Sequence, residues 1–447
     1  MPDRWFVSRR VVFPDGVRAA AIGVTHGRIT EIAATASDGV PVTDAGDAWL
    51  LPGLVDTHVH LNEPGRTEWE GFATGTRAAA AGGVTTLVDM PLNSIPPTTT
   101  ALNLHLKREA ARGKCMVDVG VCGGLVPANA PVVGSLRDAG VLAVKCFLAP
   151  SGVDEFSCVD EGSLARGLAN LAAAGLPVLV HAELPGPLVA PPLGDPSAYT
   201  TWLHARPPLS EEAAVELLFR LARQHRAQAH VVHLSAAGAL ATVARARRED
   251  VSLTAETCPH YLSFTAEAVS RGATAFKCAP PIREAANRER LWEGLRSGLL
   301  DQVVTDHSPA PGALKCIDSG DFARAWGGIA SLQLGLAAVW TEAEPRGFSV
   351  SDVVRWMAEA PARLVGLEGR KGSIRLGADA DLVIWEDDAA FMVDPARLEH
   401  RHPVTPYAGR TLRGRVRETW LRGRRVYADG AFGAAEGEGL LPTSRGS

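Results

Sequence analysis

The feature that most constrains this 447-residue chain is a repeated alternation of apolar strand-like runs with helix-like stretches between about residues 49 and 370. Eight runs have the length of short strands, at residues 50–61, 83–91, 116–123, 143–149, 177–183, 229–235, 252–257 and 302–307. Amphipathic or alanine-rich stretches separate most of them, at residues 70–81, 99–112, 161–174, 210–225 and 284–299. Strands that are apolar on both faces and alternate with helices predict an α/β fold, a parallel (β/α)8 barrel of the TIM type.

The two ends of the chain follow a different pattern. Residues 5–49 and 373–432 contain short alternating runs broken by turn residues, which predict antiparallel strands. We therefore expect a barrel over residues 50–372 and one small β-sandwich built jointly from residues 1–49 and 373–432. Residues 433–447 are rich in Gly, Glu and Ser and are expected to form a frayed tail.

The composition limits the kinds of molecule that this chain could bind. The hydrophobic content of 46% suits a large core, and a net charge of −5 without a long basic run gives no basis for binding nucleic acid or an anionic membrane. No apolar run approaches the roughly 20 residues that span a bilayer, and the start of the chain does not have the pattern of a signal peptide. The seven cysteines include no Cys-x-x-Cys pair, which argues against a disulfide framework. We expect a cytoplasmic protein that acts on a small molecule.

Polar side chains at the ends of the strand-like runs carry the functional signal. His58 and His60 follow an apolar run, and because alternate residues of a strand face the same side, their imidazoles would project into one space. By itself such a pair is as easily an accident of a polar strand end. Four other strand-like runs have an imidazole, a carboxylate or a lysine at or near their ends, namely Lys145, His181, His233 and Asp306. Since barrel active sites are assembled at the carboxyl ends of the strands, this set predicts a two-metal hydrolase, with zinc as the first choice of ion and iron, cobalt, manganese or nickel as alternatives.

Longer motifs resemble those of a known family. The chain is similar to the cyclic-amide hydrolases of the amidohydrolase superfamily, the branch that includes allantoinases, dihydroorotases and hydantoinases. The resemblance covers nearly the whole chain, and the motifs that carry it are residues 53–60, 62–72, 88–94, 145–156, 256–262 and 377–383. It implies that His58, His60 and Asp306 bind one metal ion, that His181 and His233 bind a second, and that Lys145, carboxylated by CO₂, bridges the two.

A carboxylated Lys145 also agrees with elementary electrostatics. A cationic lysine would repel two dications, whereas a carbamate is an anion with two ligating oxygens, and burial favours the neutral amine that reacts with CO₂. The alternative is that Lys145 forms a Schiff base with the substrate. In the implied reaction Asp306 is the catalytic residue, which takes a proton from the attacking water and passes it to the leaving ring nitrogen.

Within this branch the motifs are most similar to enzymes that open the ring of allantoin to give allantoate, in purine catabolism. Dihydroorotases usually carry an arginine that binds the substrate carboxylate where this chain has Asn62. An amide side chain suits a neutral ureido group, whereas a carboxylate prefers a guanidinium, although Arg66 could supply a cation nearby. Asn93 and Ser308 are further candidates for substrate contacts, with turn formation as the alternative. Hydantoinase or dihydropyrimidinase, dihydroorotase and a metal-free scaffold remain the competing functions. The resemblance also implies a homo-oligomer, with a tetramer as the expected form.

Overall fold

The larger part of the chain is a parallel eight-stranded barrel. The computed structural model describes residues 1–190 and 192–442. The barrel strands, in spatial as well as chain order, are β6 (Leu54–Val59), β7 (Val84–Asp89), β8 (Asp118–Gly124), β9 (Ala143–Phe147), β10 (Val178–His181), β11 (Ala229–Val231), β12 (Leu253–Thr257) and β13 (Gln302–Val303). A parallel bridge between Val59 and His307, with a 2.8 Å hydrogen bond from the His60 N–H to the His307 carbonyl, joins the last strand region to the first. The predicted barrel is thereby confirmed.

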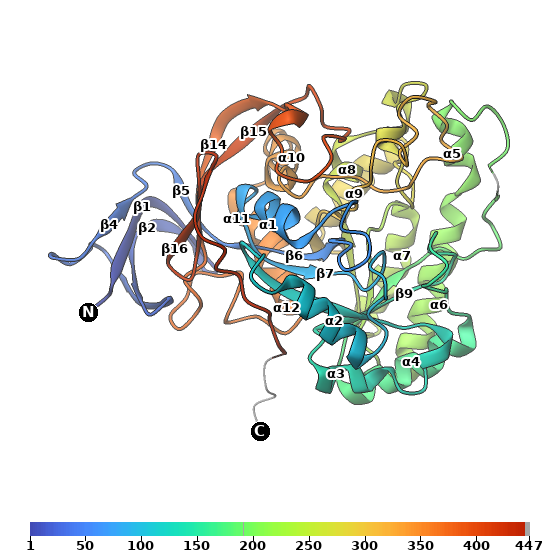
Figure 1. The fold of residues 1–447 in the computed structure, drawn as a ribbon, viewed down its shortest axis with the longest axis horizontal. Coiled ribbons are helices and arrows are strands. Elements are labelled where there is room, and N and C mark those ends of the chain that lie inside the picture. Colours follow the sequence, from blue (N-terminus) through green and yellow to red (C-terminus); the bar gives the residue numbers. More distant parts are fainter. Residues whose placement is uncertain (191, 443–447) are drawn as a thin grey trace.

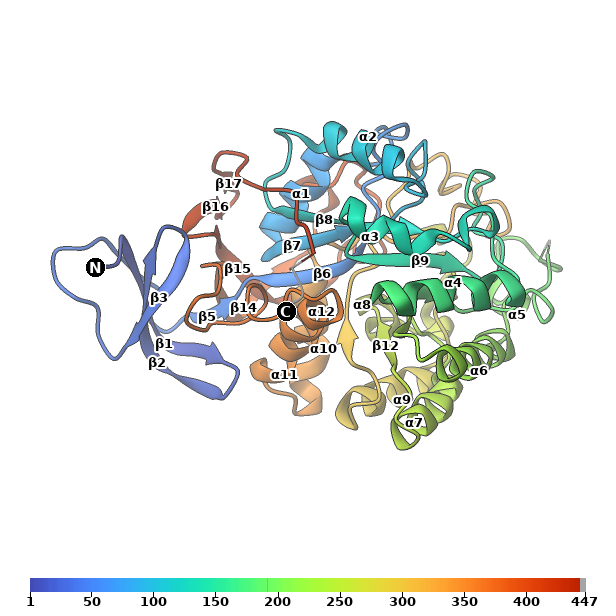
Figure 2. The ribbon, with the colours of Figure 1, turned by 90° about the horizontal axis from the view of Figure 1, so that it is seen from below.

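Helices cover the outside of the barrel, as Figures 1 and 2 show. They are α1 (Phe72–Ala81), α2 (Ala101–Ala111), α3 (Leu136–Ala139), α4 (Glu161–Ala174), α5 (Tyr199–Ala205), α6 (Pro208–His225), α7 (Leu240–Arg248), α8 (Pro259–Ser263), α9 (Ala285–Arg296), α10 (Gly335–Ala343), α11 (Val350–Val354) and α12 (Ala360–Leu364). Local sequence fixes several ends: the Asp160 carboxylate accepts a 2.7 Å hydrogen bond from the Ser163 N–H at the start of α4, and Gly175 adopts the left-handed conformation (φ 65°) that ends it. No helix in the described part of the chain has the length and apolar character needed to cross a membrane.

Both ends of the chain build a second, mixed sheet of nine strands at the left of Figure 1. Its strands are β1 (Arg4–Phe13), β2 (Gly16–Thr25), β3 (Arg28–Ala33), β4 (Val42–Asp44), β5 (Trp49–Pro52), β14 (Leu382–Met392), β15 (Thr411–Leu421), β16 (Arg424–Ala428) and β17 (Ala431–Phe432). Strand β5 pairs with β1 on one side and with β14 on the other, so it joins the N-terminal half to the C-terminal half. Phe6 of β1 and Trp420 of β15 lie three strands apart in this order, yet their ring centroids are 4.8 Å apart. Since neighbouring strands are about 4.8 Å apart, the sheet folds over on itself around a core of its own, in the manner of a sandwich.

A buried group of charges ties the second sheet to the barrel. The Lys371 ammonium lies 2.6 Å from the carboxylate of Asp118, where β8 begins, 2.7 Å from that of Asp381 and 3.0 Å from that of Asp379. The Arg422 guanidinium, which follows β15, also donates to Asp118. Lys371 and Asp118 are wholly buried, and ion pairs of this kind persist in a protein interior because each charge has several partners.

The expectation of a frayed tail is wrong for residues 437–440. The Val119 N–H donates to the Glu438 carbonyl, and the Leu440 N–H donates back to Val119, so this stretch pairs with the start of β8. The Leu440 side chain is buried. The composition of the segment lacks an apolar pattern, but backbone pairing and one apolar anchor are enough to hold it. Residues 443–447 of the predicted tail lie outside the described residues.

Candidate metal centre

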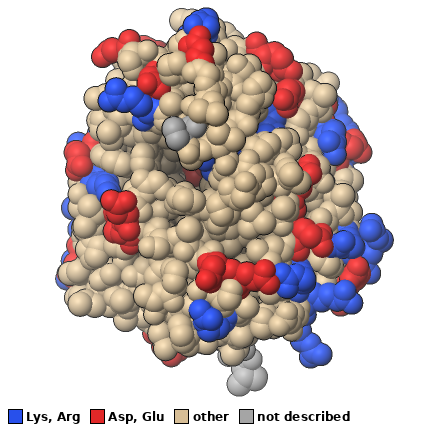
Figure 3. Space-filling view, turned by 90° about the vertical axis from the view of Figure 1, so that its right-hand side faces the viewer, with Lys and Arg blue, Asp and Glu red and all other residues tan. Residues whose placement is uncertain are grey.

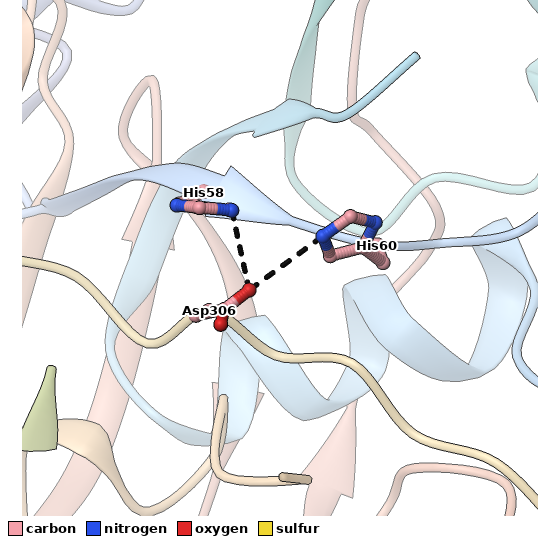
Figure 4. Close-up of side chains that lie close together, drawn as sticks. All are labelled: His58, His60 and Asp306. Atoms are coloured by element: carbon pink, nitrogen blue, oxygen red, sulfur yellow. Dashed lines mark ion pairs between the residues drawn. The ribbon is translucent and has the colours of Figure 1, made fainter. Parts of the chain in front are cut away.

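Two strand ends bring three potential ligands together. His58 lies in β6 and His60 just after it, so both imidazoles face the same side, and Asp306 follows β13 across the barrel closure. The Asp306 carboxylate oxygen Oδ1 is 3.2 Å from His58 Nε2 and 3.5 Å from His60 Nε2, as the dashed lines in Figure 4 mark. One ligand atom from each of the three residues lies within 4.8 Å of the others, which is the spacing of a metal-binding triad. All three side chains are buried.

The other three predicted ligands lie beside this triad. His181 ends β10, His233 follows β11, and His181 Nδ1 is 3.0 Å from His233 Nε2. The ring centroids of His233 and His58 are 5.4 Å apart, so the two groups adjoin. Lys145 of β9 is fully buried, and its Nζ has no hydrogen-bond partner among the described residues. All six side chains line one cavity of about 300 Å³.

Burial sets the protonation of these groups. It lowers the pKa of the Lys145 amine and of the His58, His181 and His233 imidazoles, because a charged form is poorly solvated in the interior. Neutral imidazoles and a neutral amine are the forms that bind a metal ion or react with CO₂. Burial alone would raise the pKa of Asp306, but His58 and His60 next to it outweigh that effect and hold the pKa at about 2.

Two carboxylates hold the histidine rings from behind. The Glu256 carboxylate lies 2.6 Å from His58 Nδ1, and the Glu183 carboxylate lies 2.7 Å from His181 Nε2. Glu183 is held in turn by the Arg206 guanidinium. A carboxylate on one ring nitrogen fixes which nitrogen carries the proton and leaves the other free for an ion. Sequence reasoning missed these roles, although Glu256 opens the 256–262 motif and Glu183 ends a predicted strand.

The backbone around the site is in an unusual conformation. His233 (φ 40°), Asp306 (φ 45°), Asn62 (φ 62°) and Asn93 (φ 65°) all have left-handed backbone angles. Such angles are uncommon outside glycine and, where the surrounding structure enforces them, concentrate at functional sites. In His233 and Asp306 the turn lets a residue just beyond a strand end direct its side chain into the cavity.

Two of the three residues that we predicted to contact the substrate line the cavity, and the third does not. Asn93 and Ser308 line the cavity. Asn62 is not among the described residues that line it: its side chain is fully buried, and neither amide atom has a hydrogen-bond partner within the part of the chain that the structure describes. A contact between Asn62, whose backbone has a left-handed angle, and the substrate therefore stays a prediction.

The cavity wall also contains residues that no strand pattern indicated. They are contributed by the loops and by α5, and they include Trp202, Arg206, Lys277, Arg324 and Trp326. Figure 3, which views the right-hand side of Figure 1, shows a hollow in this face of the molecule with mostly uncharged atoms around it. Among the other histidines, both ring nitrogens of His230 have protein partners: they lie 2.7 Å from Thr254 Oγ1 and 2.9 Å from Glu256 Oε2.

Comparison with known proteins agrees with the fold. The chain belongs to the amidohydrolase family, whose model matches residues 49–426. It is 54% identical to the allantoinase of Streptomyces avermitilis over 96% of each chain, and 44% identical to the allantoinase of Arabidopsis thaliana over 95% of this chain and 88% of the plant protein. Among solved structures it is similar to the L-hydantoinase (dihydropyrimidinase) of Arthrobacter aurescens, with a TM-score of 0.93, 30% identity, and coverage of 99% of this chain and 100% of that one.

Proposed function

We propose that this chain hydrolyses the cyclic amide bond of allantoin to give allantoate, with two divalent metal ions held by the six converging side chains. The observation that carries the proposal is that four imidazoles, one carboxylate and one lysine from five different parts of the barrel line a single cavity. The substrate is taken from the relatives, which are named allantoinases and match nearly the full length of the chain.

The residues present fit a pair of ions. His58, His60 and Asp306 would hold one ion, and His181 and His233 the other. The Lys145 amine is wholly buried and has no hydrogen-bond partner in the described structure, which fits a lysine that would be carboxylated and would bridge both ions, since a buried amine without a hydrogen bond is unfavourable. Nitrogen and oxygen ligands favour zinc. When bound, the ions would supply Lewis acidity toward the ring carbonyl and lower the pKa of water toward about 7.

The chain's own residues supply the proton transfer. The Asp306 carboxylate is ionised at neutral pH, so it can accept the proton of the attacking water and deliver it to the ring nitrogen that leaves. Glu256 and Glu183 keep the His58 and His181 rings in the orientation that the ions require. Opening of the ring gives a carboxylate and a ureido group.

The choice of allantoin over other cyclic amides rests on the relatives rather than on Asn62. The arginines and lysines of the cavity wall do not decide the matter: Arg206 is paired with Glu183 and the Lys277 ammonium with backbone carbonyls, whereas Arg324 is exposed and has no carboxylate within ion-pair distance among the described residues. Because the relatives are named allantoinases and the structural neighbour a hydantoinase, dihydroorotate is expected to be a poor substrate, and hydantoin and dihydrouracil are the nearer competitors.

Two measurements test the proposal. Elemental analysis of protein grown with zinc should find about two ions per chain, and a content near zero would favour a metal-free scaffold. Turnover of allantoin, hydantoin, dihydrouracil and dihydroorotate should be fastest for allantoin; a higher kcat/KM for any of the others would replace the proposed substrate. Light scattering tests the proposed homo-oligomer, for which a tetramer is expected.

A further inference from the structure

A long loop without regular secondary structure forms much of the cavity wall. Residues 309–328, all of them described, contain neither helix nor strand. The loop follows Ser308 directly, and six of its residues line the cavity: Leu314, Arg324, Ala325, Trp326, Gly327 and Gly328. A wall made of loop backbone keeps its shape only if something within the protein holds it.

The Lys315 ammonium lies at the centre of this loop. Its side chain is buried, and its Nζ donates to three backbone carbonyls: Gly328 at 2.7 Å, Lys277 at 3.0 Å and Trp326 at 3.0 Å. An ammonium has three N–H groups, so the donors and acceptors match in number. Among the described residues, Lys315 has no carboxylate partner within ion-pair distance. Its ammonium therefore donates only to backbone carbonyls of the described residues.

A second lysine holds the same loop from outside. The Lys277 Nζ donates to the Ala325 carbonyl at 2.5 Å and lies 4.2 Å from the centroid of the Trp202 ring. The Lys277 carbonyl accepts from Lys315 and also from the Gly328 N–H, at 2.9 Å. The stretch from Ala325 to Gly328 is thus fixed at both ends through two ammonium groups.

The position of Gly328 bears directly on Ser308. A Cβ atom at Gly328 would come within 2.3 Å of the Ser308 carbonyl oxygen, so the two backbones are in close contact. Any movement of Gly328 would therefore displace Ser308, which lines the same cavity as Asp306. Burial lowers the pKa of Lys315 to about 7, so an ammonium here is unfavourable unless the three carbonyls stabilise it.

We propose that Lys315 is a positioning residue, which fixes the 325–328 wall and Ser308 for binding of the cyclic substrate while taking no part in holding the metal ions. The inference rests on the proposed function in that it needs a substrate bound in this cavity. Removing the ammonium leaves the Trp326 and Gly328 carbonyls without this donor and the Lys277 carbonyl with the Gly328 N–H alone, so the loop should move away and binding should weaken more than the chemical step.

The test compares Lys315→Met with the native protein and with Lys114→Met, a matched control whose amine is partly exposed and pairs with Glu63. For Lys315→Met we expect a KM for allantoin at least tenfold higher, a kcat within a few-fold of native, and an unchanged metal content. Trypsin should cut after Arg324 at least tenfold faster. Lys114→Met should match the native protein in all four measurements. If Lys315→Met does not fold, Lys315→Gln, which keeps two N–H donors, is measured in its place.

The outcomes separate this inference from the proposed function. An unchanged KM, an unchanged rate of cleavage after Arg324, or a loss of metal together with activity would each overturn the positioning role. If the native protein does not open allantoin, the proposed function fails. The KM test then uses whichever of the four cyclic amides is turned over, and the cleavage test needs no substrate.

Discussion

Replacing Glu256 with glutamine tests how the site is held together, because it removes one charge and changes no shape. The Glu256 Oε1 atom faces His58 Nδ1 at 2.6 Å. The other oxygen, Oε2, accepts from His230 Nε2 and from Gln302 Nε2, both at 2.9 Å. Both oxygens of the native side chain thus meet donors, whereas glutamine has one oxygen and one NH₂ group.

The expected loss follows from this mismatch. Whichever way the amide introduced by Glu256→Gln turns, its NH₂ group faces a donor, so at least one hydrogen bond to a charged group (about 1.5–3 kcal/mol) is lost and at least one buried donor (about 1–3 kcal/mol) is left without a partner. The His58 ring could relieve the clash by moving its proton to Nε2. That nitrogen is the one directed at Asp306, so the relief would block a metal ligand and lower metal affinity about 10–100-fold.

The assay measures both consequences. Urea unfolding of metal-free protein, followed by tryptophan fluorescence, should show the free energy of unfolding of Glu256→Gln lowered by about 2.5–6 kcal/mol, or by less if the His58 proton moves. Elemental analysis then shows whether metal content has fallen. The control is Glu216→Gln, whose half-exposed side chain pairs with Arg245 and should be worth less than about 1 kcal/mol. Native stability together with native metal content in Glu256→Gln would refute the reasoning.

Three further substitutions test other parts of the molecule. Lys145→Ala should lose activity and at least one metal ion, with partial recovery when short carboxylic acids are added to replace the carbamate; full metal content and activity would rule out a bridging role. Asp306→Asn should keep its circular dichroism spectrum while turnover falls by about 10²–10⁴-fold or more, since Asp306 is proposed both to transfer the proton and to bind metal; unchanged turnover would remove it from the mechanism. Lys371→Met should lower the free energy of unfolding by about 3–5 kcal/mol, because it leaves the buried carboxylates of Asp118 and Asp381 without their shared ammonium, while kcat/KM per folded molecule stays native; an unchanged urea midpoint would show that the charge group does not join the two parts.

The sequence by itself determined the barrel and the membership of the candidate site. Each barrel strand is a short apolar run, and parallel strands place their carboxyl ends at one edge, so ligands at strand ends must meet there. The two-residue period of a strand was enough to put His58 and His60 on one side. The pattern is weaker in β15, which carries arginines at alternate positions, and it is the pairing of β15 with β14 that buries Leu412 and Trp420.

The tertiary structure alone decided the contacts between distant positions. Glu256 meets His58 across 198 residues of chain, and Lys315 is held by carbonyls of Lys277, Trp326 and Gly328, none of which a local pattern could single out. It also paired residues 437–440 with the start of β8. The physical reason is that a sequence pattern reports on neighbouring residues only. Hydrophobic periodicity reports which face of an element is buried, whereas the partner of a buried polar group depends on strand register and on the path of loops, which are set when the whole chain packs.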